Sequence, residues 1–347
     1  MSLDFLNHAE VISITRIATV ALAGFVVSML LTPIYTRVAY KYKWWKQVRD
    51  TTTTGEKAPI FYKLHAAKHK RHIPTMGGLV IIAAIALVTV VFNLDRNQTY
   101  LPLAVLVAAG AVGLLDDWIN IRGSGTGVAG LRSKIKFSLI LAVAIMAALY
   151  FYYVLGYNLI HVPGVGDFDI AWLYVPLLAF VIVATANAVN ITDGLDGLSG
   201  GLLSTAFGAY AIIAYFQGSY GIAGFCATVV GVMLTYTWFN IFPARFFMGD
   251  SGSFALGTTL GVVAALTNAI FILPIIGGVF VIEGGSSAIQ ILSKKIRKKK
   301  IFLSAPIHHH FEAIGWPETK VTMRFWVIGQ ILAAVGLILG LLGNKTL

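Results

Sequence analysis

The sequence has a single cysteine, Cys226, and only 15 Asp and Glu residues among 347. One cysteine excludes an intrachain disulfide framework, and without a second cysteine there is no CxxC metal or redox motif. Cys226 lies within an apolar stretch, where a small packing residue is expected. Charged residues amount to 12% of the chain, which is too few for the surface of a soluble protein of this length.

The phosphate-binding loops of soluble enzymes are also missing. No GxxxxGK[ST] motif occurs. Segment 125–130 matches GxGxxG, but it follows an apolar stretch and has no βαβ unit around it, so a dinucleotide site is not predicted. At the N-terminus, Asp4 and Glu10 stand where a cleavable signal would carry basic residues, so the first apolar segment is predicted to be retained.

Long apolar segments dominate the chain instead. It is 57% hydrophobic, and its mean hydropathy is +0.79. Runs near the ~20 residues that cross a bilayer recur along the whole length. We therefore predict an all-α polytopic membrane protein in which residues 1–347 form a single integral membrane domain. About ten transmembrane helices are predicted, at residues 17–40, 76–94, 101–118, 136–155, 172–189, 199–217, 219–241, 253–268, 270–292 and 322–342.

The distribution of charge orients these spans. Ten spans place the loops after spans 1, 3, 5, 7 and 9 on one face, and all 26 Lys and Arg residues except Arg16, Arg96 and Lys345 fall there. The positive-inside rule makes that face cytoplasmic and both termini external. The net charge of +11 then reflects topology and attraction to anionic lipid or substrate, and no nucleic-acid partner is predicted. Residues 156–172 alternate and turn like a small external β-hairpin.

Every cluster of residues that could take part in catalysis or ligand binding falls on the same face. The first is the pair Asp116 and Asp117 at the end of the third span. Adjacent carboxylates repel each other, and near a low-dielectric boundary they need a compensating cation, metal ion or proton. A solvated helix end is the simpler alternative.

A polar stripe follows the fifth span. Its members are spaced by three residues, so from the last turns of a helix they can converge on one pocket. They are Asn187, Asn190, Asp193 and Asp196. The glycines of the DGLDG segment would let the backbone approach a ligand, although a plain polar turn would also use them.

A third acidic position, Asp250, stands in the segment GDSGS at the start of the eighth span. Small residues there could expose backbone N–H groups as an anion site beside the carboxylate. An ordinary Asp or Ser helix cap is equally consistent with the pattern.

Basic and histidine residues complete the set. Lys70 and Thr75 precede a glycine pair in the first loop, where a cation could reach phosphates. The ninth loop carries a basic run at 294–300, expected at the lipid surface, and then three consecutive histidines at 308–310. Consecutive histidines do not easily face one ion, and no cysteine is near, so imidazoles facing a phosphate are favoured over a zinc site.

Carboxylates, amides, small-residue turns and cations on one face of a helical membrane body indicate transfer of a phosphate-bearing group. Hard oxygen ligands without cysteine favour Mg²⁺ or Mn²⁺. Such a metal ion neutralises phosphates and supports the leaving group, while a carboxylate handles the nucleophile. One substrate could be a soluble nucleotide-activated group, and the other a phosphate-headed lipid.

Four segments, DDWIN, NAVNITDGLDGLSGG, FNIFPARFFMGDSGS and APIHHHFEAIGWPE, closely resemble signature segments of the phospho-N-acetylmuramoyl-pentapeptide transferase family. This family belongs to the polyprenyl-phosphate N-acetylhexosamine-1-phosphate transferase superfamily. The resemblance extends from Lys70 to Trp326, with the same order and spacing. The histidine triplet favours this family over its relatives that transfer N-acetylglucosamine phosphate.

The resemblance implies a ten-span, Mg²⁺-dependent catalytic domain that forms a homodimer in the bacterial cytoplasmic membrane, with its active site on the cytoplasmic face. It implies transfer of phospho-MurNAc-pentapeptide from UDP-MurNAc-pentapeptide to undecaprenyl phosphate, which gives lipid I and UMP. This reaction is the first membrane step of peptidoglycan synthesis.

Residue roles also follow from the resemblance. Asp250 would bind the metal ion, and Asp116 or Asp117 would engage or deprotonate the lipid phosphate. Asp193 would be a further carboxylate of the catalytic site or of the metal pocket. The substrate pocket would be formed by Lys70, Thr75, Asn187, Asn190, Gly194, Leu195, Asp196, Asn240, Phe247, Gln290, Ala305, His308, His309 and His310.

One position departs from the family pattern. A lysine commonly follows the aspartate pair by three residues, and here that position is Asn120, with Arg122 two residues further on. Either Arg122 supplies the charge or the contacts to the lipid phosphate are arranged differently. A break at 283–285 is also predicted to bend the ninth span and open a groove for the polyprenyl tail.

Two other functions stay open on the sequence alone. One is a secondary transporter, since intramembrane carboxylates and broken helices also mark ion pathways. It predicts charges near mid-span, whereas the aspartates here fall at span ends. The other is a related transferase that uses UDP-GlcNAc.

Two mechanisms are compatible with the residues of a transferase. They are direct attack by the lipid phosphate and formation of a covalent aspartyl intermediate, and the first needs chiefly positioning and charge stabilisation.

Overall fold

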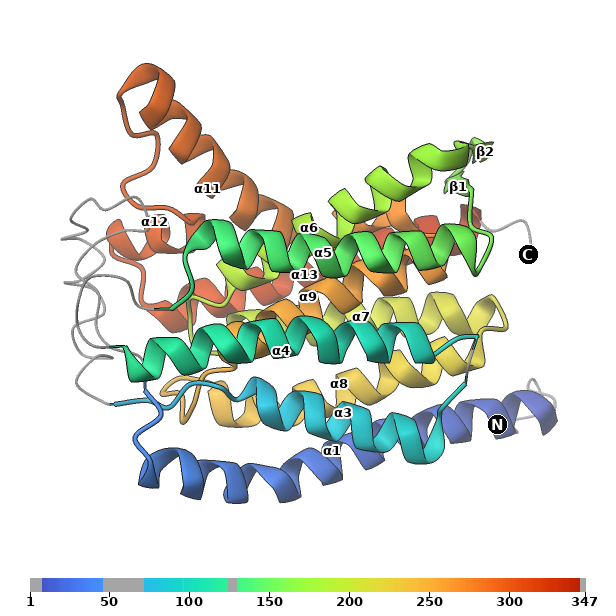
Figure 1. Ribbon diagram of the computed structural model, residues 1–347, viewed down its shortest axis with the longest axis horizontal. Coiled ribbons are helices and arrows are strands. Elements are labelled where there is room, and N and C mark those ends of the chain that lie inside the picture. The colour runs from blue at the N-terminus through green and yellow to red at the C-terminus, as the bar shows by residue number, and fades with distance from the viewer. Residues whose placement is uncertain (1–7, 46–71, 96, 124–129, 344–347) are drawn as a thin grey trace.

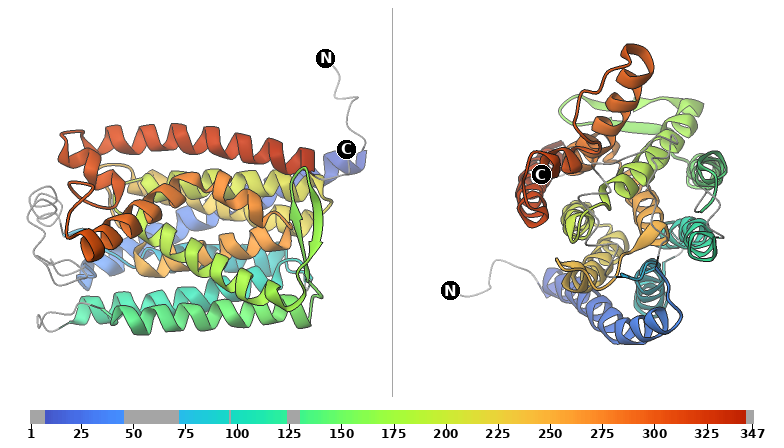
Figure 2. Two further views of the ribbon diagram at one scale, coloured as in Figure 1. Left: turned by 90° about the horizontal axis from the view of Figure 1, so that it is seen from above. Right: turned by 90° about the vertical axis from the view of Figure 1, so that its left-hand side faces the viewer.

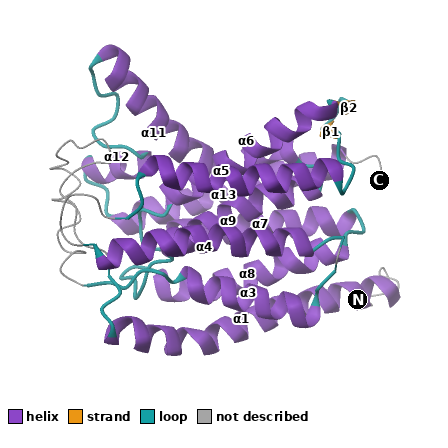
Figure 3. Ribbon diagram, viewed as in Figure 1, coloured by secondary structure: helices purple, strands orange, loops and turns teal. Residues whose placement is uncertain are grey.

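The structure of the protein is a computed structural model that describes residues 8–45, 72–95, 97–123 and 130–343. The described chain is almost entirely helical (Figures 1 and 3). Its long helices are α1 (His8–Lys41), α3 (Gly78–Phe92), α4 (Tyr100–Arg122), α5 (Ser133–Tyr153), α6 (Tyr174–Thr192), α7 (Leu198–Phe216), α8 (Tyr220–Asn240), α9 (Gly249–Leu266), α11 (Gly278–Arg297) and α13 (Glu318–Gly343). The short elements are β1 (Leu159–Val162), β2 (Gly166–Asp169), η1 (Ala171–Leu173), η2 (Ile270–Ile272), α10 (Leu273–Ile276) and α12 (Ile307–Ala313).

Seven of the described helices are long and apolar enough to cross a membrane, or eight if Ile270–Ile276 and Gly278–Arg297 together form one bent span. The prediction of a polytopic helical membrane protein is therefore confirmed, whereas the count of ten spans and the external termini stay predictions. The two other predicted spans coincide with α3, which has 15 residues, and with α9, which has 18 residues and a polar first turn.

Helix α9 occupies the centre of the bundle, as the end-on view in Figure 2 shows. All 18 of its residues are buried, and it packs against α3, α4 and α6. Because no side of α9 faces lipid, it can carry serine, threonine and glycine where an outer helix needs apolar side chains. Its glycines also bring helices close together, since a Cβ on Gly257 would lie 2.7 Å from the Cα of Ala186 in α6.

The two ends of the bundle differ in character (Figure 1). At one end, α4, α6 and α8 finish, α5, α7 and α9 begin, and α12 packs nearby. At the other end, β1 and β2 form an antiparallel hairpin in which His161 faces Asp167. The hairpin predicted within 156–172 is thus confirmed, and the start of α1 and the end of α13 lie at this end too.

The ninth predicted span bends at a different place from the one predicted. The chain turns by 81° between Ile276 and Gly278, where Gly277 has the non-helical angles φ −90° and ψ 23°. The predicted break at 283–285 is wrong, because these residues lie inside the continuous helix α11. Gly284 faces α6 at an ordinary packing distance, since a Cβ there would lie 3.5 Å from the Cβ of Ala188.

Gly257→Ala is expected to lower the melting temperature of the detergent-solubilised protein, because the new Cβ would meet the α6 backbone at 2.7 Å. Gly208→Ala in α7 is the matched control, because only Val230, at 3.9 Å, lies near its added Cβ. That variant should gain up to about 1 kcal/mol from the higher helix propensity of alanine. Thermal unfolding followed by fluorescence compares the two, and an unchanged or raised melting temperature for Gly257→Ala would contradict the close packing of α6 and α9.

Candidate active site

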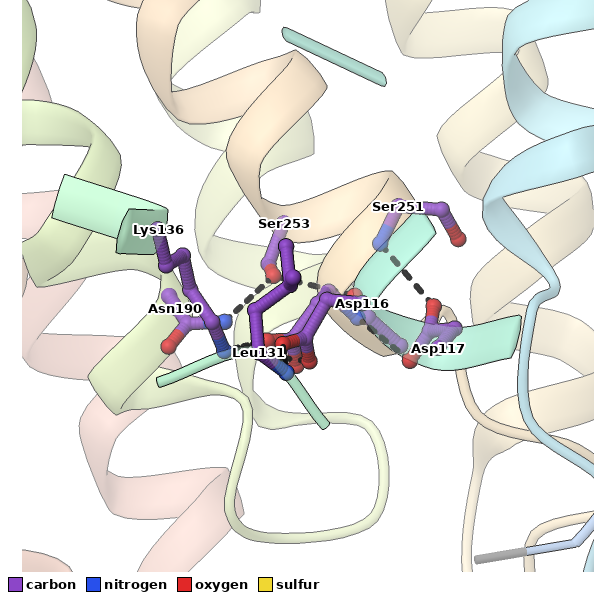
Figure 4. A network of polar contacts seen from close by, with 9 residues as sticks. Asp116, Asp117, Leu131, Lys136, Asn190, Ser251 and Ser253 are labelled. Carbon is purple, nitrogen blue, oxygen red and sulfur yellow. Dashed lines mark hydrogen bonds and ion pairs between the residues drawn. The ribbon is translucent and has the colours of Figure 1, made fainter. Parts of the chain in front are cut away.

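Three carboxylates from two helices meet at the end of the bundle opposite the hairpin. Asp116 and Asp117 lie near the end of α4, and Asp250 lies in the first turn of α9. One oxygen of each lies within 4.8 Å of the others, and all three residues are buried. Figure 4 shows Asp116 and Asp117 within the polar network at this place. The helix packing therefore joins two acidic motifs that are far apart in the sequence.

A lysine from a third helix compensates part of this negative charge. Lys136, in the first turn of α5, places its Nζ 3.0 Å from Oδ2 of Asp116 and forms an ion pair with Asp250. The backbone N–H of Leu131 donates a second hydrogen bond to Asp116, at 2.8 Å. Lys136 is not among the predicted site residues. The signal that could have found it is its place in the basic loop just before an apolar span.

Asp117 ties the end of α4 to the beginning of α9. Its Oδ1 accepts the N–H of Asp250 at 3.2 Å, and its Oδ2 accepts the N–H of Ser251 at 3.0 Å (Figure 4). The first N–H groups of a helix have no partner within the helix, and they favour a negative charge. The anion site predicted at the start of this helix is therefore filled from within the protein by Asp117.

Gly249 leaves open the space beside Asp117. Its φ of +72° is in the left-handed region that favours glycine. A Cβ at this position would overlap Oδ2 of Asp117 and lie 2.6 Å from Oγ1 of Thr75. Thr75 Oγ1 is buried and has no hydrogen-bond partner within the described part of the chain. The predicted site residue Thr75 therefore lies beside the carboxylates.

The polar stripe of α6 reaches the carboxylates through α9. The side-chain amide of Asn190 donates to Oγ of Ser253 at 2.8 Å, and Ser253 lies one turn after Asp250 (Figure 4). Asp193, the residue that ends α6, accepts a hydrogen bond from Ser199 Oγ at 2.8 Å. These two members of the stripe therefore lie at the same end of the bundle as the carboxylates.

The turn after α6 is held by the predicted residues Asp196 and Asn240. Oδ2 of Asp196 accepts the N–H of Ala244 at 3.0 Å, and the Asp196 N–H donates to Oε1 of Glu318 at 2.6 Å. Oδ1 of Asn240 accepts the N–H of Gly197 at 2.8 Å. The two side chains thus fix the turn against α8 and the following loop, and the Asp196 backbone N–H fixes it against α13.

His308 is oriented by a carboxylate that the sequence analysis treats only as part of a helix break. Its Nδ1 lies 2.8 Å from Oε2 of Glu283 in α11, and both side chains are fully buried. The Nε2 atom faces the turn after α6, because a Cβ on Gly194 would overlap it. Gly194 is therefore required where the His308 ring meets the backbone.

The three histidines have separate partners. His309 places its Nδ1 2.7 Å from Oε2 of Glu312, whereas Nδ1 of the half-buried His310 accepts the N–H of Leu303 at 3.2 Å. The Nδ1 atoms of the three histidines therefore have three different partners.

Gln290 and Ala305 belong to the neighbouring loop. Oε1 of Gln290 accepts the N–H groups of Ile301 and Phe302, and its Nε2 donates to the Phe302 carbonyl at 2.9 Å. Gln290 thereby shapes the segment that leads to Ala305 and α12.

The other predicted pocket residues are placed as follows. Leu195 is buried in the turn after α6, and Phe247 is half-buried just before α9. The side-chain amide of Asn187 donates to the Val183 carbonyl of its own helix at 2.8 Å. Lys70 lies outside the described residues.

The chemistry of this donor set fits a hard divalent cation. Three carboxylates and a threonine hydroxyl supply oxygen ligands, which Mg²⁺ and Mn²⁺ prefer. Among the described residues, Lys136 pairs with Asp116 and Asp250, and a divalent cation would add further positive charge between the three carboxylates. The carboxylates would hold the ion, and the Thr75 hydroxyl lies beside Gly249 and Asp117.

Gly249→Ala is expected to abolish Mn²⁺ binding, measured by electron paramagnetic resonance, because the new methyl group would occupy the space beside Asp117 and Thr75. Gly315→Ala is the matched control. Gly315 also has a positive φ, +99°, but no atom lies within 4 Å of its added Cβ. Equal Mn²⁺ binding by the two folded variants would show that this space is not part of a cation site.

Comparison with known proteins agrees with this geometry. Residues 99–268 match the model of glycosyl transferase family 4. The phospho-N-acetylmuramoyl-pentapeptide-transferase of Chloroflexus aurantiacus (strain ATCC 29366 / DSM 635 / J-10-fl) is 38% identical, over 98% of this chain and 94% of the relative. The proteins of the same name from Geobacillus thermodenitrificans (40% identical, over 93% and 97%) and Bacillus subtilis (41%, over 91% and 95%) are similar. The chain therefore belongs to the phospho-N-acetylmuramoyl-pentapeptide transferase family.

Proposed function

We propose that the protein transfers phospho-MurNAc-pentapeptide from UDP-MurNAc-pentapeptide to undecaprenyl phosphate, which releases UMP and forms lipid I in peptidoglycan synthesis. The observation that carries the proposal is the buried cluster of Asp116, Asp117 and Asp250 with Lys136, at one end of a membrane bundle. This position suits a reaction between a water-soluble nucleotide and a lipid whose phosphate lies at the membrane surface. Family membership gives independent support.

The reaction exchanges one phosphorus–oxygen bond for another. An oxygen of the lipid phosphate forms a bond to the β-phosphorus of the nucleotide, the bond from that phosphorus to the bridging oxygen breaks, and UMP leaves with the bridging oxygen. A divalent cation bound at the carboxylates would supply neutralisation of the diphosphate charge. Lys136 adds a fixed positive charge at the same place.

Direct attack by the lipid phosphate fits the geometry better than a covalent aspartyl intermediate. Asp116 is engaged by Leu131 and Lys136, and Asp117 accepts two backbone N–H groups. These bonds fix the positions of both carboxylates. Fixed carboxylates suit the positioning of charge, which is the main demand of transfer between two phosphates.

The nucleotide would bind at the turn after α6. Gly194 and Leu195 offer backbone there, and Asp196 and Asn240 hold the turn in place. His308, oriented by Glu283, faces the same turn. Lys70 would join this end of the pocket from the first loop.

The proposal places the cluster at the cytoplasmic face of the bacterial cytoplasmic membrane. The support is the charge of the bundle end that carries the cluster, where Arg132, Lys134 and Lys136 begin α5 and Arg245 lies between α8 and α9. A homodimer is proposed from the family resemblance alone.

Purified protein in detergent is expected to release UMP only when UDP-MurNAc-pentapeptide, undecaprenyl phosphate and Mg²⁺ are all present. Leaving out each component in turn tests that requirement, and replacing the nucleotide by UDP-GlcNAc tests the choice of sugar. If UMP is released from UDP-GlcNAc but not from UDP-MurNAc-pentapeptide, the protein is one of the related transferases that use UDP-GlcNAc. Absence of release from folded protein, together with uptake of solute by proteoliposomes, would favour a transporter.

Asp250→Ala and Asp117→Asn are each expected to lower the rate of UMP release at least about a hundredfold, because charge stabilisation at transferred phosphates is lost. Asp117→Asn should also lower the melting temperature, since it weakens the bonds to the start of α9. Asp167→Asn, in the hairpin at the opposite end, is the control and should keep the wild-type rate. Wild-type rates in either cluster variant would overturn the assignment of the site.

A further inference from the structure

Arg16 is a cation within the first apolar helix, α1. Of the three Lys and Arg residues that fall outside the basic face, it is the one that belongs to the described residues. The stretch of α1 that can cross a membrane begins at Glu10, so Arg16 lies about 9 Å inside that stretch. Ile14 before it and Leu22 after it are exposed apolar side chains. An arginine in such surroundings is costly in lipid unless an anion pairs with it.

The described residues do not supply that anion. Among them Arg16 has no ion pair and no side-chain hydrogen bond, and its side chain is exposed. The neighbouring hydroxyls of Thr15 and Thr19 each donate to a carbonyl of α1 at 2.7 Å. Just after α3, Oδ1 of Asp95 accepts two backbone N–H groups of the next turn, at 2.8 and 2.9 Å. An anion that pairs with the guanidinium therefore has to come from elsewhere.

Arg16 lies at the meeting point of two hollows in the surface of the bundle. The larger, of about 430 Å³, is lined by α1 and by Phe92 at the end of α3. The smaller, of about 100 Å³, is lined by α1 and by the start of α8, where Tyr220 lies. Ile12, Arg16 and Val20 line both hollows, and their spacing of four residues places them on one face of α1. We call the two hollows together the Arg16 groove.

We propose that the Arg16 groove binds an anionic phospholipid of the leaflet at the hairpin end, with the lipid phosphate on Arg16 and an acyl chain along the apolar lining. A guanidinium pairs well with a phosphate, because its N–H groups match two phosphate oxygens. Ile12, Val20 and Phe92 offer an apolar surface to the chain. Tyrosine, here Tyr220, is typical of the boundary between lipid and water.

Two observations favour a lipid over a second copy of the protein as the occupant. Only 22% of the spanning window of α1 is buried, so this helix faces mainly lipid. A two-fold contact centred on the groove would also bring two Arg16 side chains together, and their like charges would repel. The inference is independent of the proposed reaction, because the carboxylate cluster lies at the opposite end of the bundle.

The test measures lipid binding to the delipidated, detergent-purified protein by native mass spectrometry. The probe is phosphatidylglycerol, diacylglycerol with the same chains lacks the phosphate, and inorganic phosphate lacks the chains. Arg16→Gln is expected to weaken phosphatidylglycerol binding at least about fivefold, whereas Arg16→Lys keeps the charge and should keep most of the affinity. Arg37→Gln removes the same charge from an exposed position at the other end of α1 and should change the affinity less than about twofold.

A second pair of variants tests the groove separately from the charge. Thr15→Trp places a large ring in the larger hollow and should weaken phosphatidylglycerol binding with Arg16 intact. Ile14→Trp adds the same ring at the neighbouring exposed position, which lines neither hollow, and should leave binding near the wild-type level. If Thr15→Trp does not fold, the two arginine variants decide the matter.

Losses in Arg16→Gln and Thr15→Trp, without losses in Arg37→Gln and Ile14→Trp, would support the proposal. Wild-type affinity in Arg16→Gln, an equal loss in Arg37→Gln, or equal binding of diacylglycerol would overturn it. Displacement of the lipid by an equal concentration of inorganic phosphate would also overturn it, because the cation would then bind a free anion. A change from dimer to monomer in Arg16→Gln, with unchanged lipid affinity, would make the groove a contact between copies instead.

Discussion

The bond between the Asp117 carboxylate and the first N–H groups of α9 is the contact on which the site depends. The start of α9 is buried, so its free N–H groups cannot be satisfied by water and need a partner within the protein. Asp117 supplies that partner with both oxygens. The same bond places Asp250 beside Asp116. Asp117 therefore both pairs with the free N–H groups of α9 and brings the three carboxylates together.

Charge balance then determines what the cluster can do. Three carboxylates this close together repel one another, and Lys136 offsets only part of the repulsion. A divalent cation held by the three carboxylates would offset more of it. Glu283 and His308 form a buried hydrogen-bonded pair in the same part of the bundle.

Much of this arrangement could be predicted from the sequence, for stated physical reasons. Hydropathy locates most spans to within a few residues, and alternation with turn residues locates the hairpin, because both signals are local. The aspartate motifs could be assigned to one end of the bundle, since each follows or precedes a span. The contacts between these motifs could not be predicted. No local pattern indicates that Asp117 caps a helix more than a hundred residues away, or that Lys136 pairs with Asp250. The bend of the ninth span was assigned to the wrong glycines, since Gly277 and Gly284 look alike until their packing is known.

Helix α9 has a consequence for how the protein is made. A segment with so many small and polar residues has little tendency to enter lipid by itself, and its first turn contains Asp250. Its surroundings are provided largely by α3, α4 and α6, which precede it in the chain and are synthesised first. Because α3, α4 and α6 come first in the chain, they can pack together before α9 is synthesised. A helix that is buried along its whole length can then insert among helices that are already in place.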